Sequence, residues 1–175
     1  MPAIRSSALE ALMFADDGSV PNNPHLPFLV YRNAIDLTGT PNPEEVIESV
    51  FRDNGWGDMW RNGIYEYMHY HSMIHEVMAI ARGRAKVLFG GAQGREIDLG
   101  QGDIVVLPAG TGHQSLWIGP DLVVIGAYPG SGRYDLCLGS KVEYAKAIET
   151  IPHVPLPETD PAYGQDGPLL RLWRG

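Results

Sequence analysis

Short apolar runs separated by Gly and Pro dominate the middle of this chain. In these runs apolar residues either alternate with polar ones or cluster over a few positions, as in β-strands. They predict strands at 61–71, 75–82, 84–89, 95–99, 103–107, 112–118 and 121–128. Two earlier runs, 9–14 and 28–32, predict two further strands. So many short strands with tight turns favour an all-β, double-sheet jelly roll.

Two segments have helical spacing instead. The first begins after Asn42, a plausible N-cap, with Pro43 at the first helical position and Glu45 completing a capping box. Its apolar face, formed by Val46, Ile47, Val50 and Phe51, predicts packing against the outside of the barrel. The second helix is expected over 141–150, with Ser140 as its cap. The tail beyond it contains five prolines, which predicts an extended arm on the barrel or on a partner subunit.

The bulk composition excludes some classes of function. The chain has 175 residues, which predicts one domain with a sizeable core. Thirteen Lys and Arg against 21 Asp and Glu give a net charge of −8, which disfavours nucleic acid and anionic membranes as partners. High contents of Gly (21) and Pro (14) suit short strands joined by tight turns.

The chain carries one cysteine, Cys137, so no intrachain disulfide can form. We expect a buried or partly buried free thiol in a reducing compartment. No apolar run is long enough to span a bilayer. At the start, Glu10 interrupts any signal-like core. These features predict a cytoplasmic protein.

Four residues are spaced as ligands of one metal ion. In a strand, residues i and i+2 share a face with Cα atoms roughly 6.5–7 Å apart, so two imidazoles can reach a common ion. A four-residue loop, 72–75, would then bring a carboxylate onto the neighbouring strand. A third imidazole follows a strand and a turn-forming run at 108–112. These candidate ligands are His69, His71, Glu76 and His113, a set that suits divalent Fe, Ni, Mn or Zn, and also Cu or Co.

The two segments resemble the two conserved motifs of the cupin superfamily. The matching patterns are Gly63-x5-His69-x-His71-x4-Glu76-x6-Gly83 and Gly102-x5-Pro108-x-Gly110-x2-His113. The flanking sequence is similar to that of a small bacterial cupin family without a settled activity. One departure is Trp117, at a position where the second motif commonly has Asn, which predicts a bulkier pocket wall.

The resemblance covers roughly residues 63–128 and implies a double-stranded β-helix, the cupin jelly-roll barrel, with one or two flanking helices. We expect a single cupin domain over 1–175 with a barrel core at about 60–130. Strands and a helix would precede the core over 1–59, and a helix and Pro-rich arm would follow it over 131–175.

Strand parity assigns the neighbours of the four ligands to faces. Tyr65 and Tyr67 share the parity of the first two histidines, so they either pack in the core or orient a substrate as catalytic residues. Arg61, at the far end of the same strand, would meet an anionic group or form a structural ion pair. His75 points away from the cavity in a structural role, unless a distorted loop makes it a substitute ligand.

The same parity argument applies to the other two strands. Met78 and Ile80 should point inward with the carboxylate and make the cavity largely apolar. Ser115 and Trp117 should face inward with the third imidazole. Packing is the favoured role for the indole, ahead of contact with a substrate.

Two classes of function remain open. The first is a metal-dependent enzyme acting on a small organic molecule; the resemblance makes a dioxygenase-type activity the leading hypothesis, and isomerase, decarboxylase and hydrolase activities stay open. The second is a non-catalytic cupin that binds a metal and a small ligand, with a structural or sensing role. We expect a homodimer, because the flanking segments supply edge strands and an arm beyond what one barrel needs.

Overall fold

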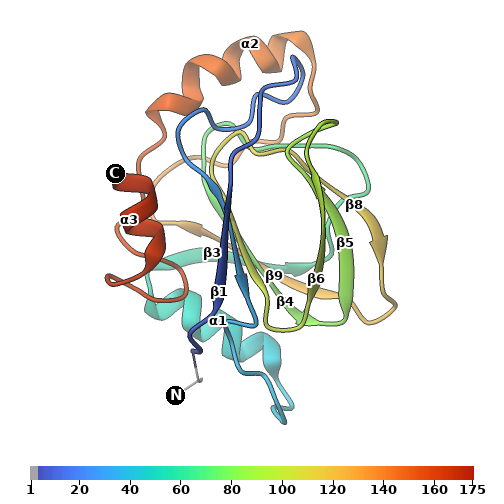
Figure 1. Ribbon diagram of the computed structural model, residues 1–175, viewed down its shortest axis with the longest axis vertical. Helices are drawn as coiled ribbons and strands as arrows, with labels where there is room; N and C mark the ends of the chain where they lie inside the picture. Colours follow the sequence, from blue (N-terminus) through green and yellow to red (C-terminus); the bar gives the residue numbers. More distant parts are fainter. Residues whose placement is uncertain (1–3) are drawn as a thin grey trace.

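Two antiparallel sheets face each other in this computed structural model, which describes residues 4–175 (Figure 1). The larger sheet has the strand order β1-β2-β7-β4-β9-β3, and the smaller has the order β6-β5-β8. The strands are β1 (Ala8–Leu12), β2 (Phe28–Arg32), β3 (Trp56–Asn62), β4 (Glu76–Arg82), β5 (Arg84–Phe89), β6 (Arg95–Gly100), β7 (Ile104–Leu107), β8 (His113–Ile118) and β9 (Val123–Pro129). This is the predicted jelly-roll β fold with flanking helices.

The helices lie outside the barrel. They are α1 (Pro43–Asp53), α2 (Lys141–Thr150), a short 3₁₀ helix η1 (Ile151–His153) and α3 (Pro168–Arg174). Helix α2 covers one end of the barrel, whereas α1 and α3 flank the larger sheet (Figure 1). None of the helices in residues 4–175 combines the length and the apolar character needed to cross a membrane.

The four central strands of the six-stranded sheet, β2, β7, β4 and β9, are buried on both faces. The inner face of this sheet contributes Met78, Ile80 and Val105 to a core cluster shared with the smaller sheet. Its outer face packs against α1 and α3, and that second cluster includes Phe51 and Trp173. Strands covered on both sides read as continuous apolar runs, and all four residues of β7 are buried.

The three-stranded sheet is covered on one face only. In β5, Ala85, Val87 and Phe89 are buried in the core between the sheets, and the residues between them are more exposed. This alternation is typical of an antiparallel sheet with one face in water. A third cluster, which includes Tyr70, Ala109 and Ile151, closes the end of the barrel beneath α2.

Most predicted elements are confirmed to within two residues, including both helices. At α2 the capping box is present, with the Ser140 side chain accepting from the Glu143 amide. At α1, however, the Asn42 side chain makes no capping hydrogen bond. Pro43 at the start of the helix and the buried apolar face account for α1 without that cap.

Two predictions of the local structure are wrong. The strand expected over 61–71 ends at Asn62, and the segment after it has only isolated bridges, at His69 and Tyr70. The tail is not simply an extended arm, because it ends in α3, which buries Leu169, Leu170 and Trp173 on the chain's own sheet. This packing removes one of the two reasons for expecting a homodimer.

Candidate metal centre

Backbone hydrogen bonds place His69 directly opposite His113. The amide of each residue donates to the carbonyl of the other, at 3.2 and 2.9 Å. Residues paired in this way in an antiparallel ladder present their side chains on the same face. The two imidazole rings therefore lie with their centroids 3.9 Å apart, although the segment that carries His69 is not a regular strand.

His71 is held from two sides. Its carbonyl accepts a hydrogen bond of 2.7 Å from the amide of Gly110, in the turn that precedes the third histidine. Gly110 has φ +97°, a left-handed conformation in which glycine is favoured. The Asp135 carboxylate accepts from the amides of Ser72 and Met73 and from the Ser72 hydroxyl, so it fixes the loop directly after His71.

Glu76 is the first residue of β4 and pairs with Leu107 of β7 in the larger sheet. Its Oε2 lies 3.2 Å from His71 Nε2 and 3.6 Å from His113 Nε2. The residue is 2% exposed, and within the described chain its Oε2 has no hydrogen-bond partner. The loop at 72–75 does not form the predicted hairpin, because β4 pairs with β7 and β9 and not with the histidine segment.

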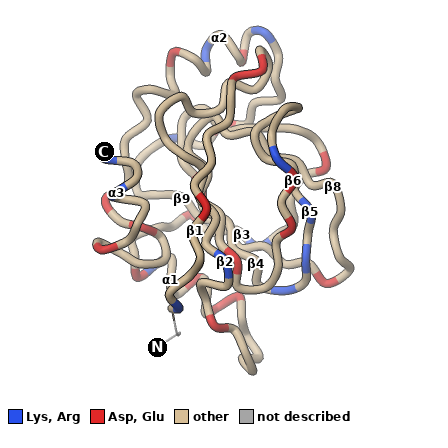
Figure 2. Tube along the Cα trace, viewed as in Figure 1, with Lys and Arg blue, Asp and Glu red and all other residues tan. Residues whose placement is uncertain are grey.

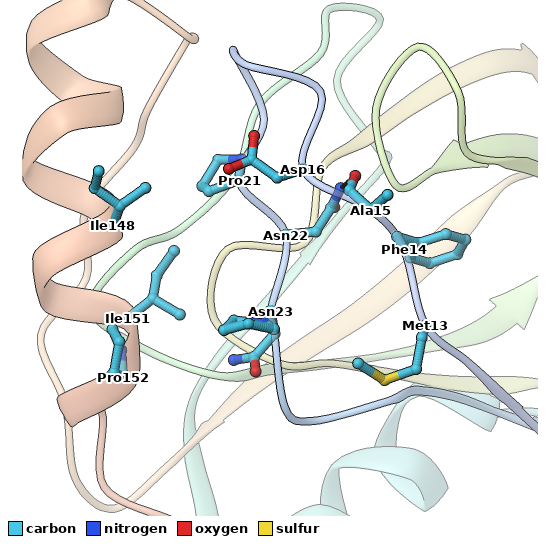
Figure 3. A pocket seen from close by; sticks show the side chains of 11 residues that line it. Met13, Phe14, Ala15, Asp16, Pro21, Asn22, Asn23, Ile148, Ile151 and Pro152 are labelled. Carbon is cyan, nitrogen blue, oxygen red and sulfur yellow. Dashed lines mark hydrogen bonds between the residues drawn. The ribbon is translucent and has the colours of Figure 1, made fainter.

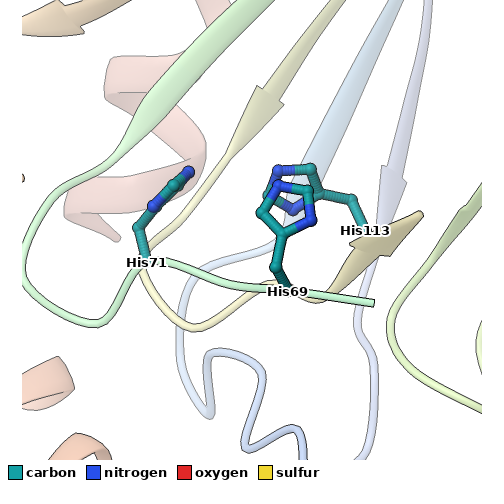
Figure 4. Close-up of side chains that lie close together, drawn as sticks. All are labelled: His69, His71 and His113. Carbon is teal, nitrogen blue, oxygen red and sulfur yellow. The ribbon is translucent and has the colours of Figure 1, made fainter. Parts of the chain in front are cut away.

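All three imidazoles use Nδ1 for a backbone hydrogen bond. A ring nitrogen facing a carbonyl must carry the proton, so each neutral ring presents an unprotonated Nε2. The accepting carbonyls belong to Tyr67, Asp135 and Thr111, at 3.0 Å from His69, 2.5 Å from His71 and 3.0 Å from His113. One ring nitrogen from each histidine lies within 4.8 Å of the others, and Figure 4 shows the three rings gathered together.

Burial determines how these groups ionise. It lowers the pKa of His69, and it lowers the pKa of His113 to about 3, so both rings stay neutral. Burial also opposes a charge on His71 and on Glu76. Their mutual attraction outweighs it, because the pKa of His71 is raised and that of Glu76 is lowered. The centre therefore combines two neutral imidazoles, His69 and His113, with a buried carboxylate that attracts positive charge to His71.

These donors fit a divalent metal ion. Three imidazole nitrogens and one carboxylate form a common ligand set for Fe, Ni, Mn or Zn. The Nδ1–carbonyl hydrogen bonds are those that orient metal-ligating histidines. An unpartnered carboxylate oxygen in a buried site is costly unless a cation neutralises it. The four residues would hold the ion.

A cavity of about 680 Å³ opens from this centre, and the four candidate ligands form part of its wall. Tyr65 and Tyr67 also line it; their rings are stacked 4.8 Å apart at 14°, and the two residues are 47% and 44% exposed. They stand near the surface and not in the core, with centroids 5.2 and 5.5 Å from the His69 ring. Met78 lines the cavity as expected from its parity.

Three lining aromatic residues were not predicted from the sequence: Trp60, Tyr128 and Tyr134. Trp60 Nε1 donates to the Tyr128 hydroxyl at 3.1 Å. Trp60 lies opposite Gly126, where a Cβ atom would collide with the indole ring. Tyr128 shares the parity of the inward-facing Val124, a signal that could have revealed it. Tyr134 lies in an irregular segment with no periodicity to follow.

The expected inward orientation of Trp117 is wrong. Ser115 is buried, but a register shift makes Leu116 an extra residue, so that Ser115 pairs with Val87 and Trp117 with Lys86. Such a bulge changes which side chains share a face. Trp117 is consequently 56% exposed and does not line the cavity, whereas Ile118 does.

Two other neighbours have structural contacts. Arg61 donates two hydrogen bonds to Glu48 of α1, at 2.6 and 2.9 Å, so it forms the structural ion pair that was one of the two expectations. His75 points away from the cavity, as predicted, but is fully buried. Its Nδ1 accepts from the Ala109 amide, and its ring packs 4.8 Å from that of Trp173 in α3.

A second cavity, of about 310 Å³, lies between the loop at 13–24 and α2 (Figure 3). Its polar side chains already have partners. Asn22 and Asn23 are hydrogen-bonded to backbone groups, and the Asp16 carboxylate accepts from the Tyr144 hydroxyl at 2.6 Å. This cavity therefore offers less chemistry than the histidine centre.

Comparison with known proteins reveals one clear relative. The chain is 40% identical to the uncharacterized protein YjlB of Bacillus subtilis (strain 168) over 164 residues, covering 94% of this chain and 96% of YjlB. The chain belongs to the YjlB family. No family model matches it. The jelly roll and the two histidine motifs of this YjlB-family protein resemble those of the cupin superfamily.

Solved structures show more distant likenesses to this YjlB-family chain. A cupin 2 domain-containing protein from Halorhodospira halophila is 14% identical, with a TM-score of 0.37 and coverage of 81% of this chain and 75% of that one. Acireductone dioxygenase from Bacillus anthracis is 19% identical, with a TM-score of 0.36 and coverage of 51% and 61%. An 11S globulin from Wrightia tinctoria is 17% identical (TM-score 0.36), and the similarity covers 45% of this chain and 21% of the globulin. Likenesses this distant transfer no activity.

Proposed function

We propose that this protein binds a divalent metal ion through His69, His71, Glu76 and His113 and acts on a small organic molecule as a metal-dependent, dioxygenase-type enzyme. One observation carries the metal site: ring nitrogens of three buried histidines lie within 4.8 Å of one another, and the unpartnered Glu76 Oε2 lies 3.2 and 3.6 Å from two of them. A buried carboxylate oxygen without a hydrogen-bond partner is stabilised by a cation. The cavity of about 680 Å³ beside it supports the binding of a small ligand.

A bound divalent ion supplies Lewis-acid chemistry, which polarises an oxygen atom of the substrate. The chain's own groups then determine how the substrate lies. The stacked rings of Tyr65 and Tyr67 form a flat wall beside His69 and orient the substrate. Burial, followed by the charge of Glu76, raises the pKa of Tyr128, so its hydroxyl keeps its proton at neutral pH. That hydroxyl could donate a proton to a substrate from the cavity wall.

Metal analysis tests the site. His69→Ala and His113→Ala should each reduce bound metal to a small fraction of the wild-type content in protein purified without added metal or chelator. The matched control is His25→Ala, because His25 is an exposed histidine remote from the motifs. Wild-type metal stoichiometry in either of the first two variants would refute the assigned ligands.

Oxygen uptake tests the activity. Iron-loaded protein should be screened with enols, diketones and thiols, which coordinate metals through oxygen or sulfur. Consumption of dioxygen that disappears in His113→Ala supports the enzyme. Silence across the panel, together with a native site saturated with zinc, would favour the non-catalytic metal- and ligand-binding alternative, because four protein ligands close a tetrahedral zinc shell.

A further inference from the structure

The cavity beside the proposed metal centre has two chemically different ends. Its inner end carries the three histidines and Glu76, all less than 7% exposed. Its outer end is aromatic: Tyr65 and Tyr67 form one wall, and Tyr134 packs against His71 with ring centroids 5.0 Å apart. A ligand that reaches the metal must therefore lie among these rings.

Among the described residues, the outer end has no cationic side chain in its lining to neutralise an anion. Within residues 4–175, no Lys or Arg side chain lines the cavity. Two cations adjoin lining residues in the sequence: Arg61, which is held by Glu48 of α1, and Arg133, which precedes Tyr134, is exposed and does not itself line the cavity. Further Lys and Arg positions lie on elements around the outside of the molecule, among them β5, α2 and α3 (Figure 2). Beyond the metal centre, the one lining residue with an ionisable carboxylate is Glu66.

Aromatic faces and an absence of cations select one kind of ligand. The face of an aromatic ring carries negative potential, so it attracts organic cations and the edges of flat rings and repels anions. A phosphate or sulfonate placed among the tyrosines would lose water without gaining an Arg or Lys partner. The carboxylate of Glu66 and the net charge of −8 also repel an anionic ligand.

We infer that the cavity selects a flat aromatic ligand that is neutral or cationic everywhere except at its metal-binding oxygens, and that it rejects ligands with an anionic outer group. This inference rests on the proposed metal centre. Tyr65, Tyr67 and Tyr134 set the specificity, and anionic ligands are rejected because the described cavity lining has no cationic side chain. Phosphorylated and sulfonated metabolites are thereby excluded as substrates.

Three catechols with the same metal-binding group test the selectivity. They are 4-methylcatechol, dopamine and 4-sulfocatechol, whose outer groups are neutral, cationic and anionic. Each is titrated into cobalt-loaded protein at low ionic strength, and binding is followed by the visible spectrum of the bound cobalt and by calorimetry. The neutral and cationic probes should bind at least about tenfold more tightly than the sulfonate. The sulfonate makes the catechol hydroxyls more acidic, which favours coordination, so this bias works against the expected order.

Variants then assign the effect to residues. Tyr65→Leu combined with Tyr67→Leu should weaken 4-methylcatechol by about tenfold and leave the cobalt content unchanged. Trp117→Leu, which removes an exposed aromatic side chain outside the cavity, should change neither quantity. Asn62→Arg places a cation on the cavity wall and should raise the affinity for 4-sulfocatechol alone.

The outcomes separate the two proposals. Equal affinity for all three probes, or no binding of any probe to cobalt-loaded protein, would overturn the selectivity and leave the metal centre standing. Failure of the wild-type protein to bind cobalt would overturn the metal centre itself. An unchanged affinity for 4-methylcatechol in the double tyrosine variant would show that the aromatic wall does not contact the ligand.

Discussion

The two sheets of the barrel differ in what covers their outer faces. The central strands of the six-stranded sheet are packed between the core and the helices α1 and α3, so they are apolar on both sides. Within residues 4–175 no helix covers the outer face of the three-stranded sheet, and alternate residues of β5 and β6 are accessible to water. The covered sheet carries Glu76, and the uncovered one carries His113.

This difference assigns separate tasks to the two sheets. A strand buried on both faces is held by many neighbours, which suits a carboxylate that must stay in place without a hydrogen-bond partner. The uncovered sheet has fewer restraints, and it supplies Ile118 to the rim of the cavity. The centre lies where the two sheets meet: the segment with His69 and His71 runs between β3 and β4 of the larger sheet, and His69 bridges to His113 of the smaller one. A metal ion there would tie both sheets together.

Removing the cover of the larger sheet should have the largest effect. Trp173 of α3 is 5% exposed; its Nε1 donates to the Pro27 carbonyl, and its ring packs on His75. Trp173→Ala should therefore reduce the free energy of unfolding by about 3–5 kcal/mol, the usual loss for a large buried aromatic side chain. Urea unfolding followed by circular dichroism measures it. A loss below about 1 kcal/mol would mean that α3 does not stabilise this sheet.

Removing the metal should have the next largest effect. A ligand that binds only the folded state at 100 times its Kd stabilises that state by about 2.7 kcal/mol. Chelation should therefore lower the Tm of metal-loaded wild-type protein, since Glu76 and His113 come from different sheets. His113→Ala is the control, because its Tm should not respond to the chelator. If chelation lowered the Tm of both proteins equally, metal bound at this site would not be what stabilises the junction of the two sheets.

Asp135→Ala should weaken metal binding indirectly, through the loop and the His71 ring that Asp135 positions. The Asp135 carboxylate fixes Ser72 and Met73, and its backbone carbonyl orients the His71 ring. Loss of a group that positions a ligand typically weakens metal binding by about 10–100-fold. Competition with a chromophoric chelator measures this affinity in protein shown to be folded. Asp121→Ala, at an exposed turn, is the control, and an equal affinity in both variants would remove Asp135 from this role.

The uncovered face should tolerate change. Trp117 is 56% exposed on β8 and does not line the cavity. Trp117→Ala should shift the free energy of unfolding by no more than about 0.5 kcal/mol and leave the metal content unchanged. Unfolding curves and elemental analysis are the measurements. A large loss of stability or of bound metal would show that the outer face of the smaller sheet contributes to folding or to the metal site.

The strands were predictable because both kinds of sheet leave a readable pattern. Covered strands such as β7 read as continuous apolar runs, and the uncovered β5 alternates. The tail was misread because its prolines outweighed a helical signal. Pro168 stands at the first helical position, and Leu169, Leu170 and Trp173 after it form one buried face.

The site was predictable where the backbone is regular or paired. Strand parity predicted that the histidines and Glu76 come together. The prediction holds for His69 although its segment is not a regular strand, because His69 pairs with His113 in an isolated bridge. The bulge at Leu116 has no sequence signal, so Trp117 was placed on the wrong face. Tyr134 and Asp135 lie in an irregular segment where only three-dimensional folding determines the neighbours.

The indole of Trp60 occupies the space that a side chain at position 126 would need. Even a methyl group at that position would force the ring to move and would disturb the bond from its Nε1 to the Tyr128 hydroxyl. Gly126→Ala on β9 would therefore change the shape of the cavity without altering any of the four proposed metal ligands. A substitution at that glycine is thus a way to change which ligand fits the cavity while the proposed metal site is retained.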